Sequence, residues 1–274
     1  MIIAKSINEL YEAKKNLIGS IGFVPTMGAL HNGHISLIRR AKDENKIVIV
    51  SIFVNPTQFL EGEDFSTYPR KDLADIEICK MSKVDILFMP SINSMYKKDE
   101  LIIMAPSIGG YVLDGASRPK HFDGMLQIVM KLLNLTSATK AYFGKKDAQQ
   151  LALIKQMVNH YFLDVEIVEC EIIRECNGLA MSSRNSYLSP KDKIRALTIF
   201  QSLNLAISMI FKKELNTKII KQEMKKVLSK VDKIEYIEIV NRDFHSLESV
   251  ELQGTIILVA VYIGDTRLID NIWI

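Results

Sequence analysis

The sequence predicts an α/β fold, a doubly wound parallel sheet flanked by helices, with a smaller α+β domain at the C-terminal end. The chain has 274 residues, 48% of them apolar, which is enough for one large core and a smaller second one. Several short apolar runs lack the alternation of a half-exposed sheet, and segments of helical periodicity separate them. After about residue 175 the order changes to long helices followed by strands, which is typical of a separate α+β unit.

The apolar runs are the predicted strands of the large sheet. Strands covered by helices on both faces carry nearly continuous apolar side chains, so these runs indicate strand–helix–strand connections. One intervening helix is predicted to begin near Gly33 or His34, and others cover 123–136 and 147–162. The predicted strands are IGFVPT (21–26), KIVIVSIFV (46–54), VDILFMP (84–90), AYFG (141–144) and DVEIVEC (164–170).

The C-terminal domain is predicted to begin at residue 176. A Ser-Pro start signal opens a long helix over 189–213, and a lysine-rich amphipathic helix follows over 217–232. Two strand candidates then complete the chain, at 234–242 and at 255–272. The boundary depends on this change of pattern alone, because no linker composition marks it.

Charge and cysteine content exclude several classes of protein. The formal net charge is only +3, and acidic residues such as Glu223 and Asp232 are interspersed among the lysines of 218–233, which favours a solvated helix face over an RNA site, so no nucleic-acid partner is predicted. The three cysteines are scattered and odd in number, which fits a reducing cytoplasm better than a disulfide framework. The N-terminus is already charged at Lys5, too soon for a signal peptide, and the longest apolar run, 47–54, is too short to span a membrane. A cytoplasmic location and no membrane partner are therefore expected.

Two histidines, His31 and His34, lie where the first of these strands turns into a helix, and three interpretations are open. They could clamp a metal, although no Cys, Glu or third His stands nearby at ligand spacing. They could be capping or surface residues without chemical consequence. They could also bind phosphate, because ligands of open α/β sheets bind beyond the carboxyl ends of strands, and Gly28 and Gly33 allow a close approach to the backbone. Neither a dinucleotide-binding nor a P-loop glycine motif is present, so imidazoles would supply the donors.

The segment HNGH resembles the H-x-G-H signature of the nucleotidylyltransferase superfamily, and the match extends over essentially the whole chain. Motifs similar to those of the pantoate–β-alanine ligase family follow one another in order: PTMGALHNGH, SIFVNPTQF, DFSTYPR, SRPKHFDG, FGKKDAQQ, GLAMSSRNSYLS and TRLIDNI. The resemblance implies a Rossmann-like catalytic domain over 1–175 that binds ATP and pantoate, and an α+β lid domain over 176–274. It implies that pantoate and ATP form pantoyl adenylate and pyrophosphate, and that β-alanine then displaces AMP to give pantothenate. It also implies a requirement for Mg²⁺ and a homodimer.

The resemblance places several donors on the ATP phosphates. Lys146 matches a phosphate-binding lysine, although outside its motif it would be one of many solvated basic residues. Asp147 matches the acceptor of the ribose hydroxyls and could equally cap the following helix. The MSSRN segment matches a second superfamily signature suited to the departing pyrophosphate, with a serine turn as the structural alternative. The implied catalytic set is His31, His34, Lys146, Ser182, Ser183 and Arg184, and the implied ATP-binding set adds Met27, Gly144, Asp147 and Met181.

The same resemblance assigns the pantoate pocket and a position near the metal. Gln58 and Gln150 match amides that hold pantoate, and amides suit this place because a cation would pair with the nucleophilic carboxylate. The rest of the pocket is Tyr68, which closes one wall, with Arg118 and His121, although His121 could instead order the loop. Asp75 matches an acidic position near the Mg²⁺ that accompanies ATP, and taken alone it would be a charge on a helix surface.

Two other functions stay open. An adenylyltransferase of the same superfamily that stops at a nucleotide product has the histidine signature but lacks the two glutamines. A non-catalytic RNA-binding or regulatory module derived from a synthetase is disfavoured by the near-neutral charge. AMP release that requires both pantoate and β-alanine would separate these functions from the ligase.

Overall fold

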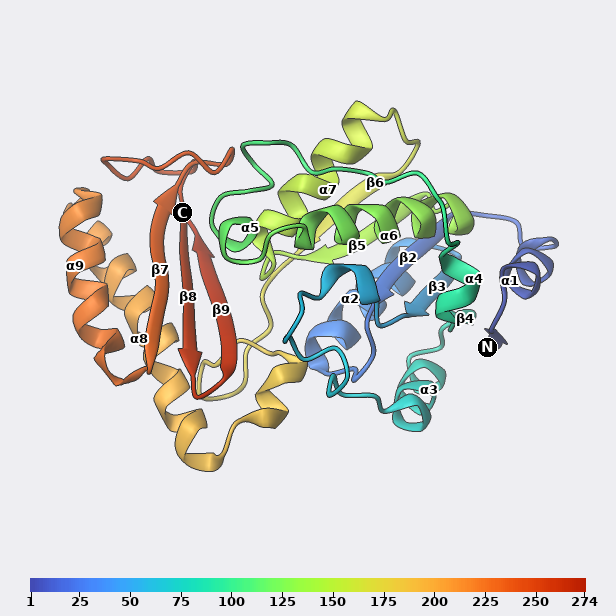
Figure 1. Cartoon of the computed structure of the whole chain (residues 1–274), viewed down its shortest axis with the longest axis horizontal. Coiled ribbons are helices and arrows are strands. Elements are labelled where there is room, and N and C mark those ends of the chain that lie inside the picture. The colour runs from blue at the N-terminus through green and yellow to red at the C-terminus, as the bar shows by residue number, and fades with distance from the viewer. The chain divides into compact units, whose positions relative to one another are not determined.

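The computed structural model describes residues 1–274 and divides the chain into two compact units. The first consists of Met1–Lys145 and Gln149–Glu171, and the second of Lys146–Ala148 and Ile172–Ile274. Figure 1 follows the chain through both. The domain limits expected from the sequence, and the catalytic and lid roles of the two domains, stay predictions.

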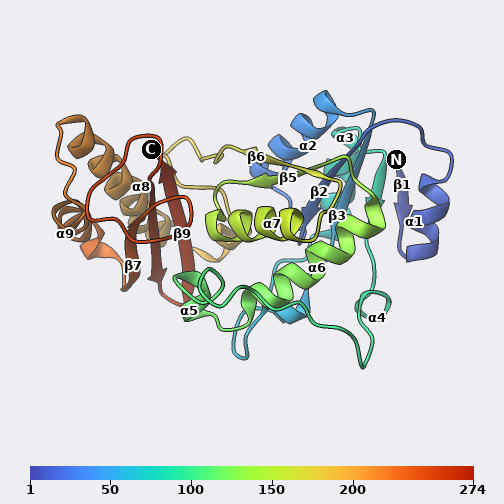
Figure 2. The ribbon, with the colours of Figure 1, turned by 90° about the horizontal axis from the view of Figure 1, so that it is seen from above.

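The first unit contains a six-stranded parallel sheet in the order β1-β4-β3-β2-β5-β6, which confirms the predicted fold class. The inner strands are largely buried, and β3 is buried at every residue, so both faces of the sheet need cover. Figure 2 shows α2 and α3 on one face and α6 and α7 on the other. The strands are β1 (Ile2–Ala4), β2 (Ile21–Thr26), β3 (Ile47–Ile52), β4 (Ile86–Phe88), β5 (Lys140–Gly144) and β6 (Glu166–Cys170).

The direction of the strand order reverses at β2, in the middle of this sheet. β2 lies between β3 and β5, so the chain runs outward from β2 through β3 to β4 and then returns to β5 on the opposite side of β2. Ligands of open α/β sheets bind at such a reversal, beyond the carboxyl ends of the strands. The helices of the first unit are α1 (Ile7–Lys14), α2 (Asn32–Glu44), α3 (Asp72–Met81), α4 (Ile92–Met95), α5 (Asp114–Ser117), α6 (His121–Thr136) and α7 (Ala148–His160), with a 3₁₀ turn η1 (Pro56–Gln58) after β3.

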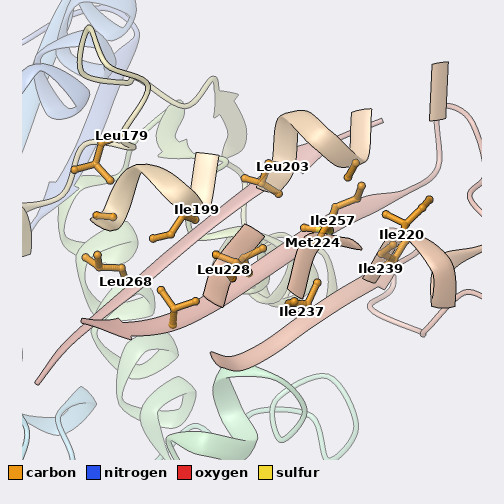
Figure 3. Close-up of a cluster of buried hydrophobic side chains, with 14 of the residues drawn as sticks. Leu179, Ile199, Leu203, Ile220, Met224, Leu228, Ile237, Ile239, Ile257 and Leu268 are labelled. Carbon is orange, nitrogen blue, oxygen red and sulfur yellow. The ribbon is translucent and has the colours of Figure 1, made fainter. Parts of the chain in front are cut away.

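The second unit is built on a three-stranded antiparallel sheet in the order β7-β8-β9. The sequence predicted one strand over 255–272, and this was wrong, because Gly264 with φ +55° turns the chain back and makes two strands of it. The sheet and helices share the apolar core drawn in Figure 3. The elements are α8 (Pro190–Phe211), α9 (Thr217–Val227), β7 (Lys233–Val240), β8 (Ile256–Ile263) and β9 (Thr266–Trp273), with 3₁₀ turns η2 (Ser183–Tyr187) and η3 (Leu228–Lys230).

Helix α8 is long and apolar enough to cross a membrane by length and composition alone. Its apolar residues Ala196, Ile199, Leu203 and Ala206 are buried in the core of the second unit. A membrane span would instead turn such residues toward lipid, so α8 is a core helix.

Candidate active site

The H-x-G-H segment joins the carboxyl end of β2 to the start of α2. His31 is the N-cap of α2, and its Nδ1 accepts a hydrogen bond from the backbone N–H of Gly33 at 3.1 Å. The Nδ1 of His34 accepts from the backbone N–H of His31 at 3.3 Å, which completes a reciprocal capping box. The two ring centroids lie 4.1 Å apart. The capping interpretation is thus correct as geometry, and the glycine between the histidines makes the tight helix start.

The capping geometry also decides what the two histidines present to a ligand. Because Nδ1 of each ring accepts a hydrogen bond, the proton of the neutral imidazole is on Nε2, and Nε2 is the donor. Two neutral donors at a helix N-terminus suit a phosphate oxygen, since the helix dipole is positive there. The metal interpretation gains no support, because no group of three or more His, Cys, Asp or Glu side chains could hold an ion.

The loop before His31 contains two residues with positive φ, and the side chain of Asp75 holds this loop by hydrogen bonds. Gly28 has φ +85° and Ala29 has φ +49°, so two successive residues adopt left-handed conformations. The carboxylate of Asp75 accepts the backbone N–H groups of Ala29 and Leu30, each at 2.8 Å. Asp75 is only 1% exposed, and burial raises its pKa. The helix-surface alternative is therefore wrong, and Asp75 fixes the histidine loop.

A second loop follows β3 and carries Gln58. The Nε2 of Gln58 lies 3.1 Å from the sulfur of Met27, so the loops after β2 and β3 meet. Asn55, which was not among the predicted site residues, donates from Nδ2 to the Gln58 Oε1 at 3.1 Å, while its own Oδ1 accepts from the Tyr96 hydroxyl. The amide of Gln58 is thus oriented with its N–H₂ group away from Asn55. The Asn-Pro pair in NPTQF is the sequence signal that could have pointed to Asn55.

Arg118 and His121 form a network behind Gln58 in which Glu63 takes part. Arg118 makes a two-pronged ion pair with Glu63, at 2.6 Å from Nε and 2.7 Å from Nη2. The Nδ1 of His121 donates to the backbone carbonyl of Gln58 at 2.7 Å, and its Nε2 accepts from Arg118 at 3.0 Å. Burial lowers the pKa of His121 to about 4, so the ring is neutral near neutral pH. The geometry matches the alternative in which His121 orders the loop. Arg118 takes part in the same ordering, because it binds both His121 and Glu63.

The remaining predicted residues of the first unit are Gly144, Tyr68 and Gln150. Gly144 ends β5, beside the carboxyl end of β2. Tyr68 is 6% exposed and packs edge-on against Phe59, at 5.8 Å between ring centroids. Gln150 is half-buried in the first turn of α7. Its neighbour Gln149 is buried, and its side chain binds the backbone of loop 109–114.

The second unit contains Lys146, Asp147 and the MSSRN segment. The Lys146 ammonium lies 3.3 Å from the carboxylate of Asp147, which directly precedes α7. Ser182 is the N-cap of η2, and its Oγ accepts from the backbone N–H of Arg184 at 3.3 Å. The serine-turn alternative is therefore correct as geometry, and it sets the direction of the segment that begins at Met181.

Comparison with known proteins decides the family, because the model of the family described as pantoate-beta-alanine ligase matches residues 2–273. The chain belongs to this family. Relatives named pantothenate synthetase include those of Aliarcobacter butzleri, 56% identical, and Campylobacter fetus subsp. fetus, 52% identical, each over 274 residues and 100% of both chains.

Solved structures of family members agree with the fold of this chain. The pantothenate synthetase of Thermus thermophilus aligns with a TM-score of 0.94 at 34% identity, over 100% of this chain and 99% of that one. The pantoate-beta-alanine ligase of Francisella tularensis, complexed with beta-gamma ATP and beta-alanine, aligns with a TM-score of 0.83 at 40% identity, over 100% of this chain and 97% of that one. The predicted family, ligase class and fold are confirmed.

Proposed function

We propose that the chain condenses pantoate with β-alanine at the expense of ATP, through a pantoyl-adenylate intermediate. One observation carries the proposal: the capped histidine pair at the carboxyl end of β2, where both Nδ1 atoms accept backbone N–H groups and both Nε2 atoms are donors. The Francisella tularensis relative, complexed with beta-gamma ATP and beta-alanine, supports the same nucleotide and amine substrates.

In the first step the pantoate carboxylate attacks the α-phosphate, and pyrophosphate leaves. The Nε2 groups of His31 and His34 and the ammonium of Lys146 stabilise the charge that develops on the phosphate oxygens. Ser182, Ser183 and Arg184 hold the departing pyrophosphate. The nucleotide further contacts the backbone of Met27, Gly144 and Met181, and its ribose contacts Asp147.

Gln58 and Gln150 hold pantoate beside the wall formed by Tyr68. Arg118 and His121 have a supporting role. Each donates a hydrogen bond to the Gln58 carbonyl, and Arg118 also donates to His121, so that together they hold the Gln58 segment in place. Because Asn55 occupies the Gln58 Oε1, the amide presents N–H donors, which match the oxygen atoms of pantoate.

In the second step the amine of β-alanine attacks the acyl carbon of the adenylate, and AMP leaves. The mixed anhydride must be kept from water until the amine arrives, and we assign this role to the C-terminal domain as a lid. Slow AMP release from ATP and pantoate without β-alanine, and fast release after its addition, is the expected result in a single-turnover experiment. Equal AMP release in both cases would contradict the protection.

The residues present do not form a protein-bound Mg²⁺ site. The candidate ligand Asp75 is buried, and both of its oxygens accept backbone N–H groups. No other acidic or histidine cluster lies nearby. We therefore treat Mg²⁺ as part of the MgATP substrate, held by phosphate oxygens.

The proposal is tested by pyrophosphate–ATP exchange with pantoate alone, since adenylation is reversible and needs no amine. Replacement of His34 or Lys146 by alanine should lower the exchange rate about a hundredfold or more, the scale expected for a preorganised donor. Lys145→Ala is the matched control, because Lys145 pairs with Glu171 and has no assigned role in the reaction. Exchange that requires β-alanine, or wild-type rates in the folded His34 and Lys146 variants, would refute the proposal.

We further propose a cytoplasmic homodimer. The segment 101–108 of the first unit, which lies outside any helix or strand, carries apolar side chains that are strongly exposed, at 91% for Leu101, 75% for Ile102 and 72% for Met104, and a second copy of the chain would cover them. Light scattering should give twice the chain mass of 31.1 kDa, and Ile102→Asp should shift it to the monomer. A wild-type monomer at micromolar concentration would refute the dimer.

A further inference from the structure

The terminal motif TRLIDNI places two buried polar residues on β9, the last strand in Figure 1. Asn271 is 2% exposed, and its Nδ2 donates to the backbone carbonyl of Lys146 at 2.7 Å. Its Oδ1 accepts from the indole Nε1 of Trp273 at 2.8 Å. An indole can only donate, so this contact fixes which end of the amide faces Lys146. A side chain 125 positions away thus holds the Lys146 backbone.

The neighbouring Asp270 ties the stretch that leads into the MSSRN segment to the same strand. Asp270 is 3% exposed and receives two hydrogen bonds from Arg174, at 2.6 Å and 3.0 Å. Arg174 also donates to the carbonyl of Gly178 at 3.1 Å and pairs with Ala180 in a β-bridge. Asp270 further accepts the backbone N–H of Asn271 at 2.8 Å, so the two anchors are directly linked.

We propose that Asn271 and Asp270 are positioning residues for adenylation, which hold Lys146 and the segment leading to Ser182 on one strand. The inference rests on the proposed function of Lys146 and Ser182 as phosphate-binding residues. The terminal motif then has a function, since neither Asn271 nor Asp270 contacts a substrate in the proposed reaction.

Asn271 matters for Lys146 because the lysine side chain is long and flexible. The Lys146 ammonium ends a flexible stem, so the place of its backbone decides which phosphate oxygens it reaches and at what entropic cost. Residues Lys146–Ala148 pack with the second unit, whereas the residues on both sides belong to the first. Asn271 is a buried and oriented contact of this three-residue stretch. A misplacement of a catalytic group by about 1 Å can cost about a hundredfold in rate.

The test is a double-mutant cycle between Asn271→Ala and Lys146→Ala, read by pyrophosphate–ATP exchange with pantoate. Asn271→Ala alone should slow exchange about tenfold or more, with the KM for pantoate changed less than about twofold. In the Lys146→Ala background the same substitution should cost less than about twofold, because the group that it positions is already gone. Thr217→Val is the matched control: Thr217 is 2% exposed and donates to the Leu247 carbonyl at 2.6 Å within the same unit. It should lower the urea midpoint without slowing exchange.

Each outcome decides a different claim. Equal losses from Asn271→Ala in both backgrounds would indicate a merely structural role and overturn the inference, as would a normal rate in the single variant. A normal rate in Lys146→Ala alone would instead overturn the proposed function of Lys146, and the inference with it. If Asn271→Ala does not fold, Trp273→Phe replaces it in the cycle, because it removes the indole N–H that orients Asn271 and keeps an aromatic ring. A loss in Trp273→Phe that disappears in the Lys146→Ala background would support the inference, and a loss of equal size in both would overturn it.

Discussion

His121 should make the protein sensitive to acid. The ring is 8% exposed, donates to the Gln58 carbonyl and accepts from Arg118. A second proton on the ring would leave two donors facing each other at the Arg118 contact and would put a charge in a buried place. Burial, and then the Arg118 charge, lower the pKa of His121 from 6.5 to about 4, although the nearby carboxylates of Asp114 and Glu63 act in the opposite direction.

The sign and size of the effect follow from proton linkage. In the unfolded chain the histidine takes up a proton near pH 6.5, whereas in the folded chain it stays neutral down to about pH 4. Between these values the unfolded state binds more protons, so the free energy of unfolding falls as the pH is lowered through this window. The contribution of neutral His121 is fully present above about pH 6.5 and is lost by about pH 4, and at about 1.4 kcal/mol per pH unit it amounts to about 3 kcal/mol.

The assay is urea unfolding, followed by far-UV circular dichroism, over the range from about pH 7.5 to about pH 4.5. His121→Gln keeps a donor for the Gln58 carbonyl but does not titrate, so its unfolding free energy should fall by about 2–3 kcal/mol less than that of the wild type over this range. His245→Gln, an exposed histidine of the other unit, is the matched control and should keep the wild-type profile. If His121→Gln and the wild type lose stability in parallel, the reasoning is refuted.

Three further substitutions test the site. Gly124→Ala should destabilise the protein by about 3 kcal/mol or more in urea, because a Cβ there would lie 2.2 Å from the carbonyl oxygen of Thr57, and unchanged stability would contradict this packing. Asp75→Asn should slow pyrophosphate exchange about tenfold, since an amide can accept from only one of the two loop N–H groups, and a normal rate would remove its role in holding the histidine loop. Arg184→Ala should slow exchange about a hundredfold with little change in the KM for pantoate, and the reverse pattern would place Arg184 at pantoate.

The strands of the large sheet could be predicted because their signal is local. A buried parallel strand is apolar at nearly every position, and β2, β3 and β5 each lie within a predicted run or overlap it closely. The edge strand β1 was missed because three residues carry too little pattern, and its place depends on pairing with β4, far along the chain. Helix α3 was missed as well, since several of its apolar residues, among them Leu73 and Met81, face solvent.

By itself the sequence determined the fold class, the family and the positions at which phosphate and pantoate groups are expected, because these depend on local patterns and on ordered motifs. Only the tertiary structure decided what the polar and charged residues around them do. Asp75 holds Leu30 across 45 positions, Glu63 holds Arg118 across 55, and Asn271 holds Lys146 across 125. A buried polar side chain takes its role from the partner that satisfies its hydrogen bonds, and when that partner lies so far along the chain, only folding brings the two together.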